Sequence, residues 1–408
     1  MTGNPPVPDA EVADVWRLLD ERVQPLDAER VPLAEARHRH LRADAKADAD
    51  QPPFDRAAMD GYAFIPEIPP AKYRVIGTVK AGEIAKRAPG PGEALRIFTG
   101  AELPAAGLAV LMQEDAQVDG EFIHVNRSLV PGEDVRLRGS DARKDDVVLP
   151  AGTTLGSVEL ALLASIGEAH PLVDPKPRVA HATTGDEIVP PEAAPGPGQI
   201  RNSNQVLIAS LLQALVPAAN IHQEHWGDDP AHAAARLAAE PFASADMVLI
   251  SGGASVGEHD YAARVLEGAG YELPVRKINS RPGRPLLVGF RGRQIAFGLP
   301  GNPVSHFVCY HMFVRRVVYR LCGFNVFGVQ KLPLGEPLLN CGNRRPTYWP
   351  AGAGPDKETR EHVVFPLRWN NSGHLAALIG TRVLFCVPPG IKELPKGSLV
   401  DTFFIDCG

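Results

Sequence analysis

Several features of common protein classes are missing from this chain of 408 residues. It has only five cysteines, and no two of them form a Cys-x-x-Cys pair, so neither a zinc knuckle nor a disulfide framework is expected. No apolar run reaches the length that crosses a membrane, and residues 1–8 lack the basic start and apolar core of a secretory signal. We therefore expect a soluble, cytoplasmic protein with no membrane partner.

Signatures of several enzyme classes and of nucleic-acid binding are missing as well. The 13 histidines include no His-Glu-x-x-His motif, and no nucleophile elbow is present. Cys309 falls within the apolar pattern of a predicted helix, which disfavours catalysis by its thiol. No Gly-x-Gly-x-x-Gly motif opens a βαβ unit, which argues against a dinucleotide oxidoreductase. The net charge of -6 argues against broad nucleic-acid binding, although a small basic pocket for a small anion stays compatible with it.

Glycine and proline, by contrast, are abundant, with 39 residues of each. This composition predicts many turns and stiff connections rather than one long helical bundle. A chain of this length has room for about two to four domains.

The pattern of apolar residues changes along the chain. Strand-like and helix-like segments alternate over residues 178–321, which predicts βαβ units around a parallel or mixed sheet. Asp9 is expected to cap a first helix, and a long helix is expected over residues 304–321. Short β-like runs over residues 51–130 predict a mostly β insertion, and those after Gly323 predict a small C-terminal β-barrel or sandwich.

Residues 298–305 read Gly-Leu-Pro-Gly-Asn-Pro-Val-Ser and connect a predicted strand to the helix that begins near Val304. Glycine lets the backbone approach a ligand closely, proline stiffens the turn, and a helix start presents unpaired N–H groups. Such a connection suits an anion. Taken alone, a tight turn without a ligand explains this segment equally well.

A second glycine-rich segment, residues 251–258, reads Ser-Gly-Gly-Ala-Ser-Val-Gly-Glu and follows the β-like run 247–250. In open α/β sheets ligands bind beyond the carboxyl ends of the strands, and both glycine-rich loops leave their strands at that end. We therefore expect the two loops to face one cleft that binds a phosphate-bearing ligand.

Carboxylates gather in the same part of the sequence, at Asp186, Glu187, Asp228, Asp229 and Asp260. Hard oxygen ligands of this kind are what Mg²⁺ takes in proteins, usually together with waters and phosphate oxygens. The alternative for Asp228 and Asp229 is a structural one, because aspartates before helices commonly serve as N-caps.

Basic residues converge on residues 276–285, which contain Arg281 and Arg284 on either side of a Pro-Gly turn. Guanidinium groups match oxyanions with two parallel hydrogen bonds, so the pair is a candidate anion site. A solvated charged loop is the alternative interpretation.

Several segments together carry a resemblance to a known family. They are PPFDRAAMDGYA (52–63), RIFTGAELP (96–104), TTGDEI (183–188), SGGASVGEHDY (251–261), RPGRP (281–285) and GLPGNPVS (298–305). In this order and at these separations, they closely resemble the molybdopterin molybdenumtransferase family, which includes bacterial MoeA and the E domain of gephyrin.

The resemblance implies an α/β and β multidomain fold and a homodimer. The implied domains are a central α/β molybdopterin-binding domain with a mixed sheet (9–28 and 177–327), a small linker domain (29–46 and 140–176), a β-rich insertion domain (47–139) and a C-terminal β-barrel (328–408). A molybdopterin adenylyltransferase is the implied protein partner.

The activity implied by the resemblance is that of a molybdenum insertase. Such an enzyme transfers molybdenum from molybdate to adenylylated molybdopterin, with Mg²⁺ assistance and release of AMP, and so forms the molybdenum cofactor. The alternatives are a non-catalytic molybdopterin-binding or scaffold protein and a variant insertase that uses tungstate.

The resemblance also implies roles for single residues. The catalytic residues would be Asp55, Glu187, Asp228, Asp260 and Arg281, and the Mg²⁺ ligands would be Asp186, Glu187 and Asp260. The residues that bind the pterin, the adenylate or molybdate would be Ser251, Gly252, Gly253, Ser255, Lys277, Arg284, Pro300, Asn302, Pro303, Ser305, Thr99, Asp60, Asp141, Arg345 and Ser372. Among these, Asp55, Asp60 and Thr99 are expected to reach the cleft from the partner protomer.

Three departures from the family pattern keep the alternatives open. Arg281 and Arg284 stand where the family more usually has lysines, and this exchange keeps the charge but alters the geometry. Residues 344–350 provide Arg345 for the first arginine of a family motif, whereas the second is missing. Around Ser372 the chain matches the family's Gly-Ser stretch only in part.

Overall fold

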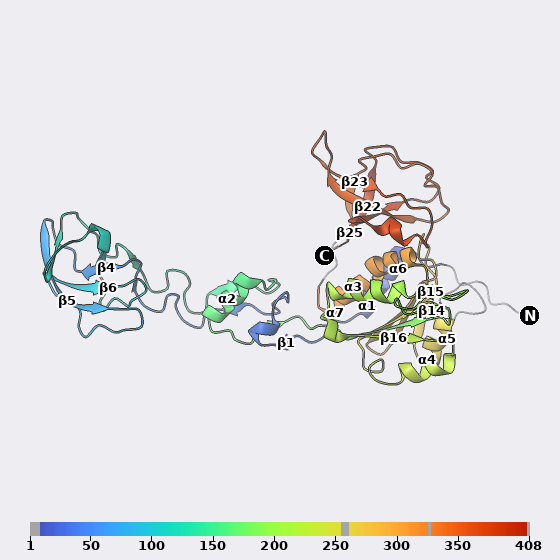
Figure 1. The fold of residues 1–408 in the computed structure, drawn as a ribbon, viewed down its shortest axis with the longest axis horizontal. Helices are drawn as coiled ribbons and strands as arrows, with labels where there is room; N and C mark the ends of the chain where they lie inside the picture. Colours follow the sequence, from blue (N-terminus) through green and yellow to red (C-terminus); the bar gives the residue numbers. More distant parts are fainter. Residues whose placement is uncertain (1–8, 254–260, 325–327, 406–408) are drawn as a thin grey trace, which may run out of the picture. The chain divides into compact units, whose positions relative to one another are not determined.

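The computed structural model describes residues 9–253, 261–324 and 328–405 (Figure 1). Contacts divide the chain into two compact units, Met1–Asp27 with Pro175–Gly408 and Ala28–Asp174. No helix in the described ranges is long and apolar enough to span a bilayer. The finer division into four domains stays a prediction.

The larger unit is built around a six-stranded sheet in the order β16-β13-β17-β20-β19-β18. Its parallel strands are β16 (Ile221–Trp226), β13 (Val179–Thr184), β17 (Met247–Ser251) and β20 (Gln294–Leu299). The antiparallel strands β19 (Leu287–Arg291) and β18 (Glu272–Val275) complete it, which confirms the predicted mixed sheet.

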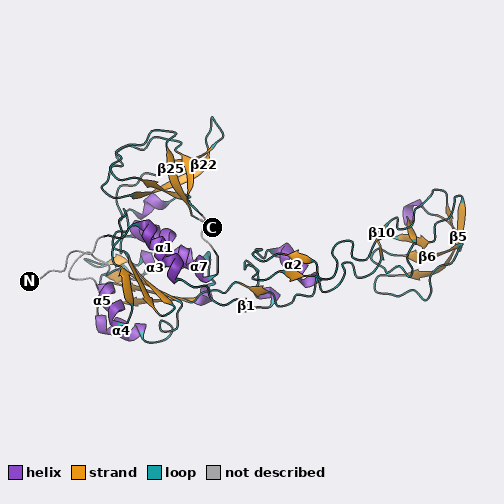
Figure 2. Cartoon of the chain, turned by 180° about the vertical axis from the view of Figure 1, so that it is seen from behind, coloured by secondary structure: helices purple, strands orange, loops and turns teal. Residues whose placement is uncertain are grey.

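Helices cover both faces of this sheet, as Figure 2 shows for the purple helices around the orange strands. Along β17, Met247 and Leu249 face one apolar core while Val248 and Ile250 face another, because successive side chains of a strand alternate. The first core contains side chains of α1 (Val12–Arg22), α3 (Ser203–Gln213), α6 (Pro303–Cys309) and α7 (Arg315–Leu321). The second contains side chains of α4 (Pro230–Leu237) and α5 (Tyr261–Gly268).

Two helix predictions need correction. The N-cap position of α1 is Glu11, without a side-chain capping bond, and Asp9 pairs with Arg284 instead. The expected helix over residues 304–321 is interrupted by a π-helical turn, η4 (Tyr310–Val314). Residues 304–314 are all buried, so their apolar pattern does not reveal how the backbone hydrogen bonds are spaced.

The C-terminal part of the larger unit is a five-stranded antiparallel sheet in the order β21-β25-β24-β22-β23. Its strands are β21 (Gln330–Pro333), β22 (Thr347–Pro355), β23 (His362–Pro366), β24 (Val383–Val387) and β25 (Leu399–Phe404). Among the described residues, one bridge, between Leu334 and Val364, connects the two edges. The predicted barrel is therefore closed by one bridge and not by a continuous ladder, which a pattern of short strands does not disclose.

The smaller unit is rich in β-structure. Its main sheet has the order β7-β4-β6-β5-β9-β8. These strands are β4 (Gly61–Phe64), β5 (Ala71–Val79), β6 (Glu93–Ile97), β7 (Ala109–Met112), β8 (Gln117–Asp119) and β9 (Phe122–Val125). A separate apolar core that includes Leu41, Leu155 and Leu163 surrounds α2 (Ser157–Ser165).

Short elements complete the two units. The short strands pair as β1 (Glu29–Arg30) with β12 (Leu172–Val173), β2 (Ala45–Lys46) with β11 (Val147–Leu149), β3 (Arg56–Ala57) with β10 (Val135–Arg136), and β14 (Ile188–Val189) with β15 (Ile200–Arg201). Four short 3₁₀ helices are described: η1 (Leu33–Glu35), η2 (Gln113–Asp115), η3 (Ala218–Asn220) and η5 (Leu375–Leu378).

Candidate active site

A cavity of about 1290 Å³ lies at the carboxyl ends of the parallel strands in the larger unit. It is lined by the loops that follow β16, β13, β17 and β20, by residues 280–285, and by two segments near Arg345 and Ser372. Because β17 and β20 are neighbours, their two glycine-rich loops lie side by side, as the sequence predicted. The cavity therefore occupies the place where open α/β sheets bind ligands.

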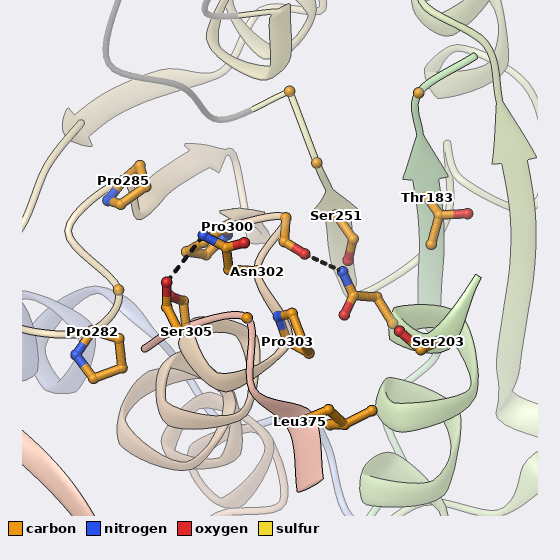
Figure 3. Close-up of a pocket in the computed structure, with 18 of the residues that line it drawn as sticks. Thr183, Ser203, Ser251, Pro282, Pro285, Pro300, Asn302, Pro303, Ser305 and Leu375 are labelled. Atoms are coloured by element: carbon orange, nitrogen blue, oxygen red, sulfur yellow. Dashed lines mark hydrogen bonds between the residues drawn. The ribbon is translucent and has the colours of Figure 1, made fainter. Parts of the chain in front are cut away.

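The loop after β20 is held from two sides. The Asn204 side chain at the start of α3 donates a 2.7 Å hydrogen bond to the Gly301 carbonyl. Ser372 accepts a bond from the Asn302 side chain at its hydroxyl (3.1 Å) and another from the Val304 N–H at its carbonyl (3.0 Å). Figure 3 shows Pro300, Asn302, Pro303 and Ser305 between Pro282 on one side and Ser251 on the other. This loop is therefore fixed before any ligand arrives.

The loop after β17 brings main chain to the cavity wall. The Gly252 N–H donates to the Leu299 carbonyl at 3.1 Å, which ties this loop to the end of β20. Gly252 has a φ of 98°, and a Cβ there would lie 2.8 Å from the Thr184 carbonyl oxygen. Only glycine suits this position. Ser255 and Asp260 lie outside the described residues.

Carboxylates lie on the side of the cavity next to β13 and β16. The Asp228 N–H donates to Asp186 Oδ1 at 3.1 Å, and the Asp186 N–H donates to Asp228 Oδ2 at 3.4 Å. Glu187 and Asp228 line the cavity, whereas Asp186 supports the loop from outside the lining. Asp229, and not Asp228, caps α4 through a 2.9 Å bond from the Ala231 N–H, so the capping alternative holds for one of the two.

Tyr261 supports this acidic side from α5. Its single hydroxyl proton is shared between the Gly227 carbonyl (3.1 Å) and the Asp229 carbonyl (3.2 Å). Burial raises the pKa of Tyr261 to about 12, and the nearby aspartates act in the same direction. The phenol therefore stays protonated and acts as a hydrogen-bond donor that shapes the loop.

In the part of the chain that the structure describes, no group of three or more His, Cys, Asp or Glu side chains is arranged to hold a metal ion by itself. Glu187 and Asp228 nevertheless line the cavity from adjoining loops, which the reciprocal bonds between Asp186 and Asp228 join. This donor set suits Mg²⁺, which takes hard oxygen ligands and often only one or two carboxylates beside waters and phosphate oxygens.

Five of the described arginines line the cavity, and three of them, Arg281, Arg284 and Arg345, lie close to one another. The Arg281 guanidinium lies 5.1 Å from the ring centre of Trp369, a cation–π contact that orients it. Arg345 donates a 3.1 Å bond to the Ser280 carbonyl, and burial together with the Arg284 charge lowers the pKa of Arg345. Arginine keeps its charge at any pH in proteins, so this part of the cavity is cationic.

Arg284 is not a free anion donor, which corrects the simplest expectation for the pair. Asp9 accepts two bonds from it, at 2.7 Å from Nε and 3.2 Å from Nη2. Lys277 is not among the residues that line the cavity, and its carbonyl accepts a bond from the Ala10 N–H. Both outcomes depend on the N-terminal segment, which is distant in sequence from residues 276–285.

Four of the expected residues belong to the smaller unit. Asp60 accepts bonds from the Thr99 N–H (2.8 Å) and hydroxyl (2.7 Å), and the bond from the N–H is the main reason that the pKa of Asp60 is lowered. Asp55 accepts a 2.8 Å bond from the Arg138 N–H. Asp141 pairs with an arginine of β10, which lowers the pKa of Asp141. Their participation in the cleft of the larger unit stays a prediction.

Several polar residues of the site carry no motif in the sequence. Asn204 and Trp369 act on loops that are far away along the chain. His181 and His306 are completely buried beneath the two glycine-rich loops and both bond to Ser251. The only sequence signal for the two histidines is an imidazole inside an otherwise apolar strand or helix.

The fold and cavity define a class of protein: an open α/β sheet that presents glycine-rich loops, carboxylates and arginines to a small anionic ligand. Family models agree with this class. Residues 10–167 match the MoeA N-terminal region (domain I and II), and residues 180–320 match a probable molybdopterin binding domain.

Whole-length relatives give the family. A molybdopterin molybdenumtransferase from Nostoc sp. is 34% identical over 97% of this chain and 94% of the relative. One from Staphylococcus aureus (strain Mu50) is 27% identical over 97% of this chain and 95% of the relative. Two crystal structures of molybdopterin biosynthesis MoeA protein from Pyrococcus horikoshii are similar at 28% and 25% identity, with TM-scores of 0.80 and 0.73. They cover 97% and 98% of this chain, and 99% and 100% of the solved chains.

The chain belongs to the molybdopterin molybdenumtransferase family. This membership confirms the family and the enzyme class predicted from the ordered motifs.

Proposed function

We propose that the protein transfers molybdenum from molybdate to adenylylated molybdopterin and releases AMP, which forms the molybdenum cofactor. The observation that carries the proposal is a cavity lined by the carboxylates of Glu187 and Asp228, by a group of arginines that includes Arg281 and Arg345, and by glycine-rich loops. A ligand that combines a phosphate group with a separate oxyanion matches this distribution of charge.

The chain's own residues would act mainly by binding and orientation. Arg281 and Arg345 would hold an oxyanion, because both guanidinium groups line the cavity and have fixed partners. Gly252 and Gly253 would let main-chain N–H groups approach the phosphates. Glu187 and Asp228, which line the cavity, would hold Mg²⁺, and Asp186 would position the loop of Asp228. Mg²⁺, when bound, would neutralise charge on the phosphate oxygens.

No protein nucleophile is needed for the release of AMP. Water would attack a phosphorus of the pterin–adenylate anhydride, the bond between that phosphorus and the bridging oxygen would break, and AMP would leave. The fixed donors of the cavity would stabilise the charge that develops, at no reorganisation cost during the step. Cys309, whose thiol lies 3.7 Å from the Gly283 carbonyl, is completely buried, and burial raises the pKa of its thiol far above its usual value.

The test is an incubation of purified protein with adenylylated molybdopterin, molybdate and Mg²⁺. AMP is expected in the medium, and the product is expected to activate a cofactor-free molybdoenzyme. The variant Arg281→Ala should lower both signals strongly. Arg276→Ala is a matched control, because Arg276 lies in the same basic segment but pairs with Glu267 and does not line the cavity. Absence of both products across metal conditions would refute the proposal.

A non-catalytic binding protein is the second candidate, and the Arg284–Asp9 pair favours it, because one expected oxyanion donor is already occupied. In that case AMP and molybdopterin would bind, but no AMP would be released from the adenylylated form in the same incubation. Binding with turnover excludes this candidate.

Shared cavities in a homodimer are a separate part of the proposal. If Asp60 and Thr99 complete the cleft of the partner protomer, Asp60→Ala and Arg281→Ala variants should each be inactive alone. Mixed dimers should regain part of the activity, because one of their two cavities is intact. Co-expressed variants that form mixed dimers and stay inactive would show that each cavity is built by one protomer.

A further inference from the structure

A continuous chain of hydrogen bonds, partly buried at Gln223 and fully buried at His181 and His306, runs beneath the two glycine-rich loops. Gln223 Nε2 lies 2.9 Å from the Gln205 carbonyl and 2.9 Å from His181 Nδ1. His181 Nε2 lies 2.7 Å from Ser251 Oγ, and Ser251 Oγ lies 3.3 Å from His306 Nε2. His306 Nδ1 lies 3.1 Å from the Pro300 carbonyl, where the chain ends.

The two carbonyls at the ends determine every proton in this chain. A carbonyl only accepts, so His306 must donate from Nδ1 to Pro300, and its Nε2 must accept the hydroxyl proton of Ser251. At the other end Gln223 donates one proton to the Gln205 carbonyl and one to His181 Nδ1. His181 therefore carries its proton on Nε2 and donates it to Ser251. All donors and acceptors in the chain are matched when both imidazoles are neutral.

Burial favours this neutral state. Both imidazoles have no exposed surface, and burial lowers the pKa of His306 to about 4 and that of His181 to about 3. The histidines consequently add no positive charge beneath the cavity. Their effect on a ligand comes from where they hold the loops.

We propose that His181 and His306 are positioning residues that fix the spacing between the loop after β17 and the loop after β20. Ser251 and Pro300 both line the cavity, whereas neither histidine does. The hydrogen-bond chain connects these two loops through the interior, in addition to the direct bond from the Gly252 N–H to the Leu299 carbonyl. This inference rests on the proposed function, because it concerns the width of the same cavity.

Asparagine variants of the two histidines each remove one hydrogen bond from this hydrogen-bond chain. The amide of asparagine takes the place of Nδ1 and does not reach the place of Nε2. His306→Asn therefore keeps the donor to Pro300 and loses the bond to Ser251, and His181→Asn keeps the acceptor for Gln223 and loses the bond to Ser251. Each variant should weaken binding of AMP or molybdate about tenfold, the equivalent of one buried hydrogen bond.

The double variant separates positioning from ordinary packing. If the hydrogen-bond chain acts as one unit, the double variant His181→Asn with His306→Asn should bind AMP and molybdate no more weakly than either single variant. If the two sites act independently, their losses should add to within about twofold. His311→Asn is the matched control, because His311 is also buried, lies on the following π-helical turn and does not line the cavity.

The experiment is titration calorimetry of the full-length protein with AMP and with molybdate, beside a thermal unfolding curve for each variant. Folded single variants that bind both probes within about twofold of the wild type would overturn the inference, as would additive losses. Wild-type protein that binds neither probe would count against the proposed function instead. Amide exchange then decides the inference: faster exchange at Gly252 and Val304 in the asparagine variants supports it, and unchanged exchange overturns it.

A spectroscopic readout tests the proton assignment directly. Nitrogen NMR of labelled protein should show His306 with its proton on Nδ1 and His181 with its proton on Nε2, both neutral at pH 7. These opposite tautomers follow from the Pro300 carbonyl at one end and the Gln223 amide at the other. Equal tautomers, or a charged ring, would contradict the chain of bonds.

Discussion

The ion pair between Asp9 and Arg284 predicts that removing a carboxylate strengthens anion binding. Asp9 engages Arg284 through two hydrogen bonds at 2.7 Å and 3.2 Å, and Arg284 lines the cavity. In Asp9→Asn the guanidinium loses its charged partner and becomes available to an oxyanion. The variant also removes one negative charge that opposes the binding of any anion nearby.

The size of the effect follows from the exposure of the pair. The Arg284 side chain is 42% exposed and that of Asp9 is 20% exposed, so solvent screens much of their attraction. Partly exposed pairs of this kind contribute about 0.2–1 kcal/mol. If this free energy becomes available for binding molybdate, the dissociation constant should fall by at most about fivefold. The free energy of unfolding should fall by no more than about 1 kcal/mol.

The assay is a molybdate titration of wild-type and Asp9→Asn protein at low and at high salt. The gain in affinity should shrink as salt rises, because the Debye length falls from about 30 Å at 0.01 M to about 10 Å at 0.1 M. Asp20→Asn is the matched control, since Asp20 likewise makes two contacts with an arginine, Arg316, that does not line the cavity. Equal molybdate affinity in all three proteins at low salt would refute the reasoning.

Two further predictions concern backbone shape and pH. Gly252→Ala should lose AMP binding, and its free energy of unfolding should fall by more than the about 1–2 kcal/mol that left-handed strain alone costs, because the new Cβ meets a carbonyl. Gly198 has a similar φ of 80° and open space around it, so Gly198→Ala should show only the cost of the strain in a denaturant titration. Because burial lowers the pKa of His306 to about 4 and of His181 to about 3, the unfolded chain takes up these protons first as pH falls below 6.5. The free energy of unfolding of the wild type should therefore fall by about 1.4 kcal/mol per pH unit for each histidine as the pH is lowered from 6.5 to 4. If the double asparagine variant shows the same dependence of unfolding free energy on pH, this account is wrong.

Local sequence was sufficient for the parts of the site that depend on backbone shape. The loop at residues 298–305 and the one that begins at Ser251 could be predicted as neighbours, since glycine and proline set the turns and parallel strands bring their carboxyl ends to one edge. The alternation of strands and helices predicted a parallel or mixed sheet, and the sheet is mixed.

Side-chain pairing across long distances in sequence could not be predicted in this way. Asp9 carries the signal of a helix cap, yet a guanidinium 275 residues further along the chain takes its carboxylate. His181 and His306 look like isolated polar residues within apolar segments, because their shared partner, Ser251, is far from both in sequence. Such outcomes depend on which element packs against which, and periodicity does not contain that information.

The two hydrogen bonds that Ser372 accepts from the loop after β20 make the C-terminal sheet a participant in ligand affinity. The segment around Ser372 helps to hold the loop in the form that a ligand would contact, and because coupling between two sites is reciprocal, a bound ligand should also hold this segment more firmly in place. Bound substrate should then protect the chain between residues 328 and 372 from proteases.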